Sequence, residues 1–336
     1  MANQKITRTL ALLFISGAVL ATAAAENPFI GQWELTIPGG AAGWLGVEEK
    51  DGNLQASIMW GAGSVVPVTS AKMKSNQLLL TRTYEIERTT AAGKKEKVNH
   101  TDQISAALHG DKMDLMLTPV PDEKSAEPPR GSGFTGHRQP PMPPAPDLSK
   151  VKFGPPINLF NGTDLTGWRL TDSKAVNGWR VEDGLLVNTP AQEEGKPHKN
   201  YGNLRTEQEF EDFNVNVVVR VDKDQNSGVY LRGIYEVQVA DGHGVDPHNM
   251  GAVYSRITPT ESAEKPAGEW QTLDITFVDR HVTVVFNGKR IIDNKPVMGC
   301  TGGALWSDVS RPGPIYLQGD HTGITYKSLV LKPVIK

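Results

Sequence analysis

The stretch from Asn226 to Asp241 constrains the fold most, because it predicts two short strands that meet at Gly233. Side chains alternate across a strand, so residues two apart share one face. One face of this strand pair is apolar and is expected to pack on a core. The other face combines a phenol, a guanidinium, a carboxylate and an amide, which suits a ligand rich in hydroxyl groups; it carries Tyr230, Arg232, Glu236 and Gln238.

Short strand-like runs separated by turn residues recur along the whole chain, and helical periodicity is almost absent. Residues 28–120 contain such runs at the spacing typical of a small antiparallel barrel or sandwich. Gly31-Gln32-Trp33 resembles the Gly-x-Trp opening of lipocalin-like barrels. In the second half, Asn287-Gly288 lies between two apolar runs, which is a strong hairpin signal. We therefore predict an all-β chain in which a small lipocalin-like antiparallel β-barrel precedes a jelly-roll sandwich.

The length of 336 residues allows two domains. Prolines crowd the region between them and favour extended backbone. The predicted organisation is a signal peptide over residues 1–25, a small β-barrel-like domain over 26–120, a Pro-rich linker over 121–155 and a jelly-roll domain over 156–336. Within the linker, the glycine-containing stretch 131–138 is expected to be the more flexible part.

The N-terminus is typical of an export signal. Lys5 and Arg8 precede an apolar run that is too short to span a bilayer, and small residues follow it. We expect the protein to be periplasmic or secreted. No cysteine directly follows the signal and no other segment is long enough to be a transmembrane helix, so no membrane anchor is expected after cleavage.

The charge and the cysteine content argue against nucleic-acid binding and against a disulfide within the chain. The net charge is −3 and no long basic run occurs, so nucleic-acid binding is not expected. Cys300 is the only cysteine, so no disulfide can form within one chain. Because Cys300 lies in a turn of small residues, we predict a buried apolar role for it rather than a nucleophilic one.

Residues 156–333 resemble a known family through several ordered blocks. Each block is weak alone, but together and in order they are specific. The second half is similar to the 3-keto-disaccharide hydrolase family, formerly a domain of unknown function, which has a concanavalin/LamG-like jelly-roll fold. The matching blocks are Leu159–Trp168, Trp179–Gly184, Asn226–Arg232, Tyr235–Gln238, Gly251–Tyr254, Lys265–Trp270, Asn287–Gly288 and Gly313–Gln318 followed by Asp320 and His321.

The resemblance implies an exported enzyme with a carbohydrate substrate, a hydrolase or lyase acting on glycosides oxidised at C3. A C3 ketone acidifies the proton at C2, so a base can remove it, the group at C1 can leave by elimination, and water can add back. Such a site needs a base, a donor for the enolate oxygen and an acid. Two alternatives stay open: a non-catalytic carbohydrate-binding protein on the same sandwich, and ligand binding by the N-terminal barrel.

Glu236 and His321 are the candidate catalytic residues. Glu236 lies on the polar strand face. The alternative to a catalytic role is a structural one, in which Glu236 forms an ion pair with Arg232. His321 titrates near neutral pH and follows a strand in the last matched block. The candidate substrate-binding residues share these matched blocks and are Tyr230, Arg232, Gln238, Tyr254, Lys265, Gln318 and Asp320.

The loop after the second strand offers a possible cation site. Carboxylates and imidazoles can hold a divalent cation that polarises a ketone. Their spacing matches no standard zinc pattern, and a solvated loop is the competing interpretation. The candidate ligands are Asp241, His243, Asp246 and His248.

Overall fold

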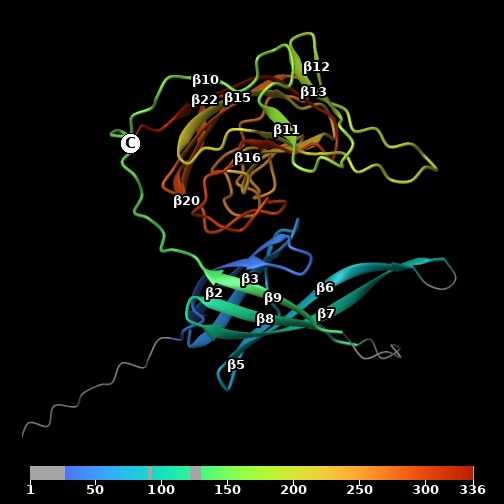
Figure 1. Ribbon diagram of the computed structural model, residues 1–336, viewed down its shortest axis with the longest axis vertical. Coiled ribbons are helices and arrows are strands. Elements are labelled where there is room, and N and C mark those ends of the chain that lie inside the picture. The colour runs from blue at the N-terminus through green and yellow to red at the C-terminus, as the bar shows by residue number, and fades with distance from the viewer. Residues whose placement is uncertain (1–26, 90–92, 122–129, 336) are drawn as a thin grey trace, which may run out of the picture.

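The computed structural model describes residues 27–89, 93–121 and 130–335, and in these ranges every regular element is a β-strand. The all-β prediction is confirmed. The predicted signal peptide lies outside the described residues. Among the described residues, no helix is long and apolar enough to cross a membrane. Figure 1 shows an N-terminal sheet below and a sandwich above, joined by an extended segment.

The N-terminal sheet has nine antiparallel strands in the order β4-β3-β2-β1-β9-β8-β7-β6-β5. Hydrogen bonds do not join its two edge strands, so within the described residues the sheet is not a closed barrel, and its likeness to lipocalins stays a prediction. Its strands are β1 (Gly31–Thr36), β2 (Ala42–Lys50), β3 (Asn53–Trp60), β4 (Val65–Pro67), β5 (Ser70–Lys74), β6 (Gln77–Thr89), β7 (Lys95–His109), β8 (Lys112–Pro119) and β9 (Ser132–Arg138).

Trp33 anchors the small core of this sheet. Its side chain is fully buried, and its indole N–H donates to the carbonyl of Phe29 at 2.9 Å. The Arg138 guanidinium covers the ring at 4.2 Å from its centroid. Alternate residues of the strands complete the core, among them Leu35, Leu45, Ile58, Leu80 and Ile104.

Strand β9 corrects the sequence-based view of the linker. Residues 131–138 were expected to be flexible, but Ser132–Arg138 pairs with both β1 and β8. Phe134 is buried in the core, and Gly136 lets β9 pass close to Leu35, whose Cδ2 would lie 3.0 Å from an added Cβ. The connection to the sandwich therefore begins after Arg138.

The sandwich consists of two antiparallel sheets. The larger has the order β12-β13-β22-β15-β18-β19-β20, with β10 paired to β22, and the smaller has the order β11-β14-β21-β16-β17. The strands of the larger sheet are β10 (Ile157–Asn158), β12 (Trp179–Glu182), β13 (Leu185–Asn188), β15 (Phe213–Arg220), β18 (Trp270–Val278), β19 (His281–Phe286), β20 (Lys289–Pro296) and β22 (Ile324–Pro333). Those of the smaller sheet are β11 (Trp168–Leu170), β14 (Leu204–Thr206), β16 (Asn226–Leu231), β17 (Tyr235–Ala240) and β21 (Tyr316–Leu317).

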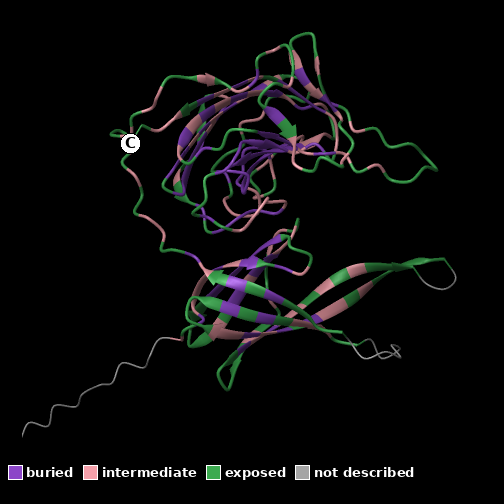
Figure 2. Ribbon diagram, viewed as in Figure 1, coloured by how far each residue is buried: buried purple, intermediate pink, exposed green. Residues whose placement is uncertain are grey.

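The core lies between these two sheets. In β15 buried and partly exposed residues alternate along the strand, as a sheet with one covered face requires. In β17 five of the six residues are buried, so loops cover its second face as well. Figure 2 shows this concentration of buried residues around the smaller sheet. The predicted polar strand face therefore exists inside the protein rather than at an open surface.

The N-terminal sheet packs directly on the sandwich. Trp44 belongs to the sandwich's hydrophobic cluster, and the Arg256 guanidinium lies 4.1 Å from its ring centroid. Gly299 makes room for this indole, since an added Cβ would lie 2.2 Å from Trp44 Cδ1. The connecting segment is also held, because Arg280 donates to the carbonyl of Pro140 at 3.0 Å.

Candidate functional site

The hairpin of β16 and β17 places two functional side chains opposite each other. Tyr230 pairs with Glu236 in the strand register, so both point to the same face, as alternation predicts. Gly228 makes room for the carboxyl group: a Cβ there would lie 2.3 Å from Glu236 Oε1. Glu236 is 4% exposed, and its backbone N–H donates to the Thr301 hydroxyl at 2.9 Å.

Two stacked tyrosines line the carboxyl group. The Tyr230 and Tyr316 rings are parallel within 11°, with centroids 3.9 Å apart. The Tyr316 hydroxyl donates to the carbonyl of Gly303 at 3.0 Å. The Tyr230 hydroxyl lies 2.9 Å from Glu236 Oε2 and 2.8 Å from the carbonyl of Gly302. Both phenols are therefore held by the loop at residues 302–303.

These contacts favour a neutral Glu236. Tyr230 has one hydroxyl proton, and the Gly302 carbonyl can only accept. If Tyr230 donates to Gly302, then Glu236 must donate to the Tyr230 oxygen, which requires a protonated carboxyl group. Burial, the largest effect, raises the pKa of Glu236 to about 8 although the Tyr230 hydrogen bond opposes it. A carboxylic acid that keeps its proton at neutral pH can act as a general acid.

His321 and Asp320 form a second titratable pair near Glu236. Asp320 Oδ1 lies 2.8 Å from His321 Nδ1, and both side chains are nearly half exposed. This hydrogen bond is the main reason that the pKa of His321 is raised. The charge of His321 lowers the pKa of Glu236 and that of Asp320 raises it, so the three groups are electrostatically coupled. The chain therefore bends so that these two neighbours meet, a geometry that a regular strand does not give.

Arg232 does not join this group. It lies in the turn after β16 with φ +54°, so strand alternation ends one residue before it. Its guanidinium donates to the carbonyls of Val309 and Arg311 and holds that loop. The alternative of an Arg232–Glu236 ion pair is not found in the described residues.

Gln238 lies in β17 and Gln318 directly follows β21 of the same sheet, and each has local hydrogen bonds. Gln238 Nε2 donates to the carbonyl of His248 at 3.2 Å, and Gln238 Oε1 accepts from the N–H of Val239. The backbone of Gln318 pairs with Gly228 and Ser227, while its side-chain oxygen is buried without a donor among the described residues. Gln318 is therefore the one of the two with unused acceptor capacity.

No hydrogen bond joins the side chains of Tyr254 and Lys265 to the Glu236 carboxyl group in the described residues, although the backbone N–H of Tyr254 donates to the Glu236 carbonyl at 3.0 Å. The Tyr254 hydroxyl lies 3.4 Å from that of Ser64, in the N-terminal sheet's loop 61–64. The same loop contacts the residues that hold the tyrosines, because Gly303 donates to the carbonyl of Gly61 at 3.2 Å. Lys265 is exposed and donates to the carbonyl of Trp270. The N-terminal sheet thus supports the loop 302–303.

The predicted cation ligands do not gather. In the described part of the chain, no group of three or more His, Cys, Asp or Glu residues could hold a metal ion. Asp246 accepts from His248 within its own turn, and Asp241 accepts from the backbone N–H of Asp224. These bonds fit the competing interpretation of a loop held by its own side chains.

Sequence reasoning missed Tyr316, Thr301 and the loop 302–303. Tyr316 lies in a matched block, two residues before Gln318, so alternation could have placed it on the same face. Nothing in the sequence indicates that the small-residue turn at 299–303 covers β16 and β17. Cys300 in that turn is fully buried, which raises the pKa of its thiol to about 12 and agrees with an apolar role.

Comparison with solved structures found similar chains. A candidate glycosyl hydrolase of Parabacteroides distasonis is 27% identical, with a TM-score of 0.43, and the match covers 57% of this chain and 92% of that one. A second from the same organism is 21% identical, with a TM-score of 0.46 and coverage of 54% and 94%. Porphyranase B of Zobellia galactanivorans is 10% identical, with a TM-score of 0.33 and coverage of 59% and 100%.

None of the curated proteins compared with the chain matches it. A family model does match, over residues 155–332, and its description is the 3-keto-alpha-glucoside-1,2-lyase-like domain. The match spans more than half of the chain and contains Glu236, His321 and both stacked tyrosines. It agrees with the family that the ordered sequence blocks resemble. The chain belongs to the 3-keto-alpha-glucoside-1,2-lyase-like domain family.

Proposed function

We propose that the chain is an exported enzyme that cleaves 3-keto glycosides by proton abstraction at C2, elimination of the C1 substituent and hydration. Family membership supports a glycoside-acting enzyme. The observation that carries the finer proposal is a neutral buried acid, Glu236, electrostatically coupled to the His321–Asp320 pair. One group can give a proton and the other can take one.

His321 is the proposed base. In the neutral imidazole, Nδ1–H donates to Asp320, which leaves the lone pair on Nε2. Nε2 takes the C2 proton, and the electron pair of the C2–H bond forms the C2–C3 double bond of an enolate. The hydrogen bond to Asp320 raises the pKa of His321, which makes the neutral imidazole a stronger base.

Glu236 is the proposed acid. As the enolate returns to the ketone, a C1–C2 double bond forms and the C1–O bond breaks. The Glu236 proton passes to the departing oxygen, which leaves as an alcohol. Water then adds hydroxyl to C1 and hydrogen to C2, so the net change is hydrolysis. If the product leaves before water adds, the same steps give the lyase outcome.

The test uses a 3-keto glucoside and the same glucoside unoxidised, with and without a chelator, in D₂O. NMR follows deuterium exchange at C2 and release of the alcohol. We expect release from the 3-keto substrate only. His321→Ala should lose both exchange and release, whereas Glu236→Gln should keep exchange and lose release. His109→Ala is the matched control. His109 Nε2 lies 3.4 Å from Asp114 Oδ2, so it also forms a His–Asp pair, but this pair is exposed and belongs to the N-terminal sheet.

Three outcomes would contradict the proposal. Release from neither glucoside would remove the enzymatic assignment, and binding without release would favour a non-catalytic carbohydrate-binding protein. Full activity in both site variants would remove the residue assignment alone. Export is part of the proposal and rests on Lys5, Arg8 and the apolar run that follows; N-terminal sequencing of the protein recovered from the periplasm or medium would test it.

A further inference from the structure

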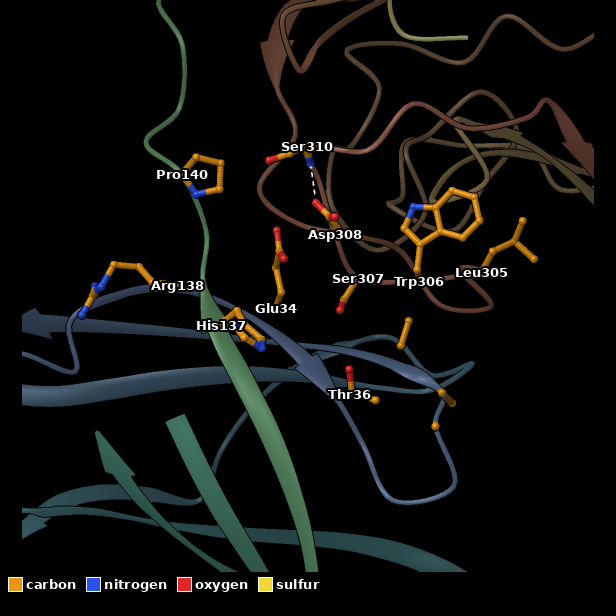
Figure 3. Close-up of a pocket in the computed structure, with 13 residues that line it drawn as sticks. Glu34, Thr36, His137, Arg138, Pro140, Leu305, Trp306, Ser307, Asp308 and Ser310 are labelled. Atoms are coloured by element: carbon orange, nitrogen blue, oxygen red, sulfur yellow. Dashed lines mark hydrogen bonds between the residues drawn. The ribbon is translucent and has the colours of Figure 1, made fainter. Parts of the chain in front are cut away.

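A cavity of about 550 Å³ lies between the N-terminal sheet and the sandwich, apart from Glu236. Figure 3 shows Glu34 and Thr36 on the strand side, and the loop from Leu305 to Ser310 facing them. We call this space the seam cavity. Its volume falls in the range of about 300–1,000 Å³ that is usual for small-molecule sites.

The walls of the seam cavity combine oxygen acceptors with an apolar side. Glu34 Oε1 accepts from the N–H of Val309 at 3.0 Å, which links the two halves of the protein. Asp308 contributes a second carboxyl group and accepts from the N–H of Ser310 at 2.8 Å. Further hydroxyl and apolar groups in the lining belong to Thr36, Ser307, Leu305 and Trp306.

Two basic side chains, His137 and Arg138, line the cavity, and the charge of Arg280 acts on Glu34 from nearby. Arg138 is part of the lining, but its guanidinium donates to the carbonyls of Pro28 and Ile30 and stacks on Trp33. The guanidinium in the lining is therefore already engaged, so apart from His137 the charged and polar side chains of the lining are mainly acceptors, which disfavours phosphate or another anion. In the described residues no set of three metal-ligating side chains forms here either, which disfavours a divalent cation.

Trp306 supplies an aromatic wall with an unused donor. Arg311 lies 3.8 Å from its ring centroid, so the ring is held in place. Its indole N–H is buried and has no acceptor among the described residues. Because protein atoms cover the N–H, Trp306 offers a ligand in the cavity its ring rather than this donor.

We propose that the seam cavity is a second carbohydrate site that takes an unoxidised sugar unit. Carboxylates accept from vicinal sugar hydroxyls, serine and threonine hydroxyls exchange hydrogen bonds with them, and an indole suits the apolar face of a pyranose. Only the choice of carbohydrate as ligand class rests on the proposed function; the site's residues differ from those that are proposed to move protons. Because both halves build the cavity, binding requires the N-terminal sheet in its docked position.

Calorimetric titration of the full chain with cellobiose and maltose tests this site, with inorganic phosphate as the competing ligand class. We expect binding of at least one disaccharide. Trp306→Ala should weaken it about tenfold through loss of the aromatic contact, and Glu34→Gln should weaken it several-fold. Glu236→Gln should leave it unchanged. The matched control is Glu48→Gln, an exposed change on β2.

The outcomes separate this site from the proposed active site. Disaccharide binding that Trp306→Ala weakens and Glu236→Gln does not would support the seam site even if no 3-keto glucoside is cleaved. Binding that Glu236→Gln abolishes and Trp306→Ala leaves intact would place the sugar at the other site and overturn the inference. Absence of disaccharide binding, or binding of phosphate alone, would overturn it as well.

Discussion

Glu236 and Glu34 are the same side chain in two different settings, one inside the sandwich and one at the seam between the two halves. Burial is the largest effect on both and raises the pKa of Glu236 to about 8 and that of Glu34 to about 7. Glu236 is enclosed by two phenols and a glycine, whereas Glu34 lines a cavity and its carboxyl group accepts from the N–H of Val309.

The two settings show how the degree of burial of a carboxyl group determines whether it can donate a proton or accept hydrogen bonds from a ligand. A carboxyl group that holds its proton past neutrality is available as an acid, and its neighbours fix the direction in which it can donate. A carboxyl group that titrates close to neutrality at a cavity wall is available as an acceptor for ligand hydroxyls. The two regions are therefore expected to respond differently to mutation and to pH.

The largest expected effect is on turnover of a 3-keto glucoside by Glu236→Gln. Removing a general acid typically lowers kcat by about 10²–10⁴-fold. The amide keeps the size of the side chain and can still donate to Tyr230, so the fold should be retained. Glu34→Gln provides the comparison and should change kcat by less than about threefold, since its carboxyl group lies at the seam. Equal losses in both variants would erase the distinction between the two regions.

The next effect concerns the seam itself. Trp44→Ala removes a nearly buried indole from the cluster that joins the halves, and such truncations cost about 3–5 kcal/mol. We expect a lower unfolding temperature and a split of the calorimetric transition into two. Trp270→Ala is the control, because Trp270 is only partly buried on the outer side of β18. A single transition at the original temperature would show that Trp44 does not couple the halves.

A smaller effect is expected when the space around Glu236 is filled. Gly228→Ala places a Cβ against the carboxyl group, and overpacking of this kind costs about 1–3 kcal/mol. The displaced carboxyl group should also lose alignment with Tyr230, so kcat should fall together with stability. Gly133→Ala is the matched control in a strand, since its nearest neighbour would be Met116 Cε at 3.9 Å. Denaturant unfolding and kcat, measured on both variants, check this prediction. Wild-type stability and kcat in Gly228→Ala would contradict the close contact between Gly228 and the Glu236 carboxyl group.

Much of the hairpin that carries the candidate site is predictable from local rules. Alternation alone puts Tyr230 and Glu236 on one face, and the register confirms their pairing. Alternation fails at Arg232 because its positive φ ends the strand one residue early. The ordered blocks predict the family and the jelly-roll half of the fold, and Asn287-Gly288 correctly marks the turn between β19 and β20.

The features that enclose the site depend on contacts between distant segments. The loop 302–303 over β16 is also held from the N-terminal half, where Gly303 donates to the carbonyl of Gly61 and Trp44 lies against Gly299. Strand β9 looks like linker in sequence because its glycines suggest flexibility, yet Gly136 is what allows close approach to β1. Local patterns contain no information on such pairings, so the burial of Glu236 and the seam cavity could not be predicted from them.

The smallest expected effect is a difference in the pH dependence of stability. For both glutamates the folded state binds a proton more tightly than the unfolded chain, whose carboxyl pKa is near 4.5. Each group therefore contributes stability that is fully present below pH 4.5 and is lost as pH rises through the folded pKa. The loss should end near pH 8 for Glu236 and near pH 7 for Glu34.

Chemical denaturation between pH 4.5 and 9 of the wild type, Glu236→Gln and Glu34→Gln measures these windows. Glu236→Gln should remove a slope approaching about 1.4 kcal/mol per pH unit, including the part between pH 7 and 8. Glu34→Gln should remove a shallower slope that ends near pH 7, because partial exposure screens the group, and because the charges of Asp308 and Arg280 act on it in opposite directions. If Glu34→Gln removes a steeper slope of unfolding free energy against pH than Glu236→Gln does, Glu34 would be the more enclosed of the two groups, contrary to this prediction.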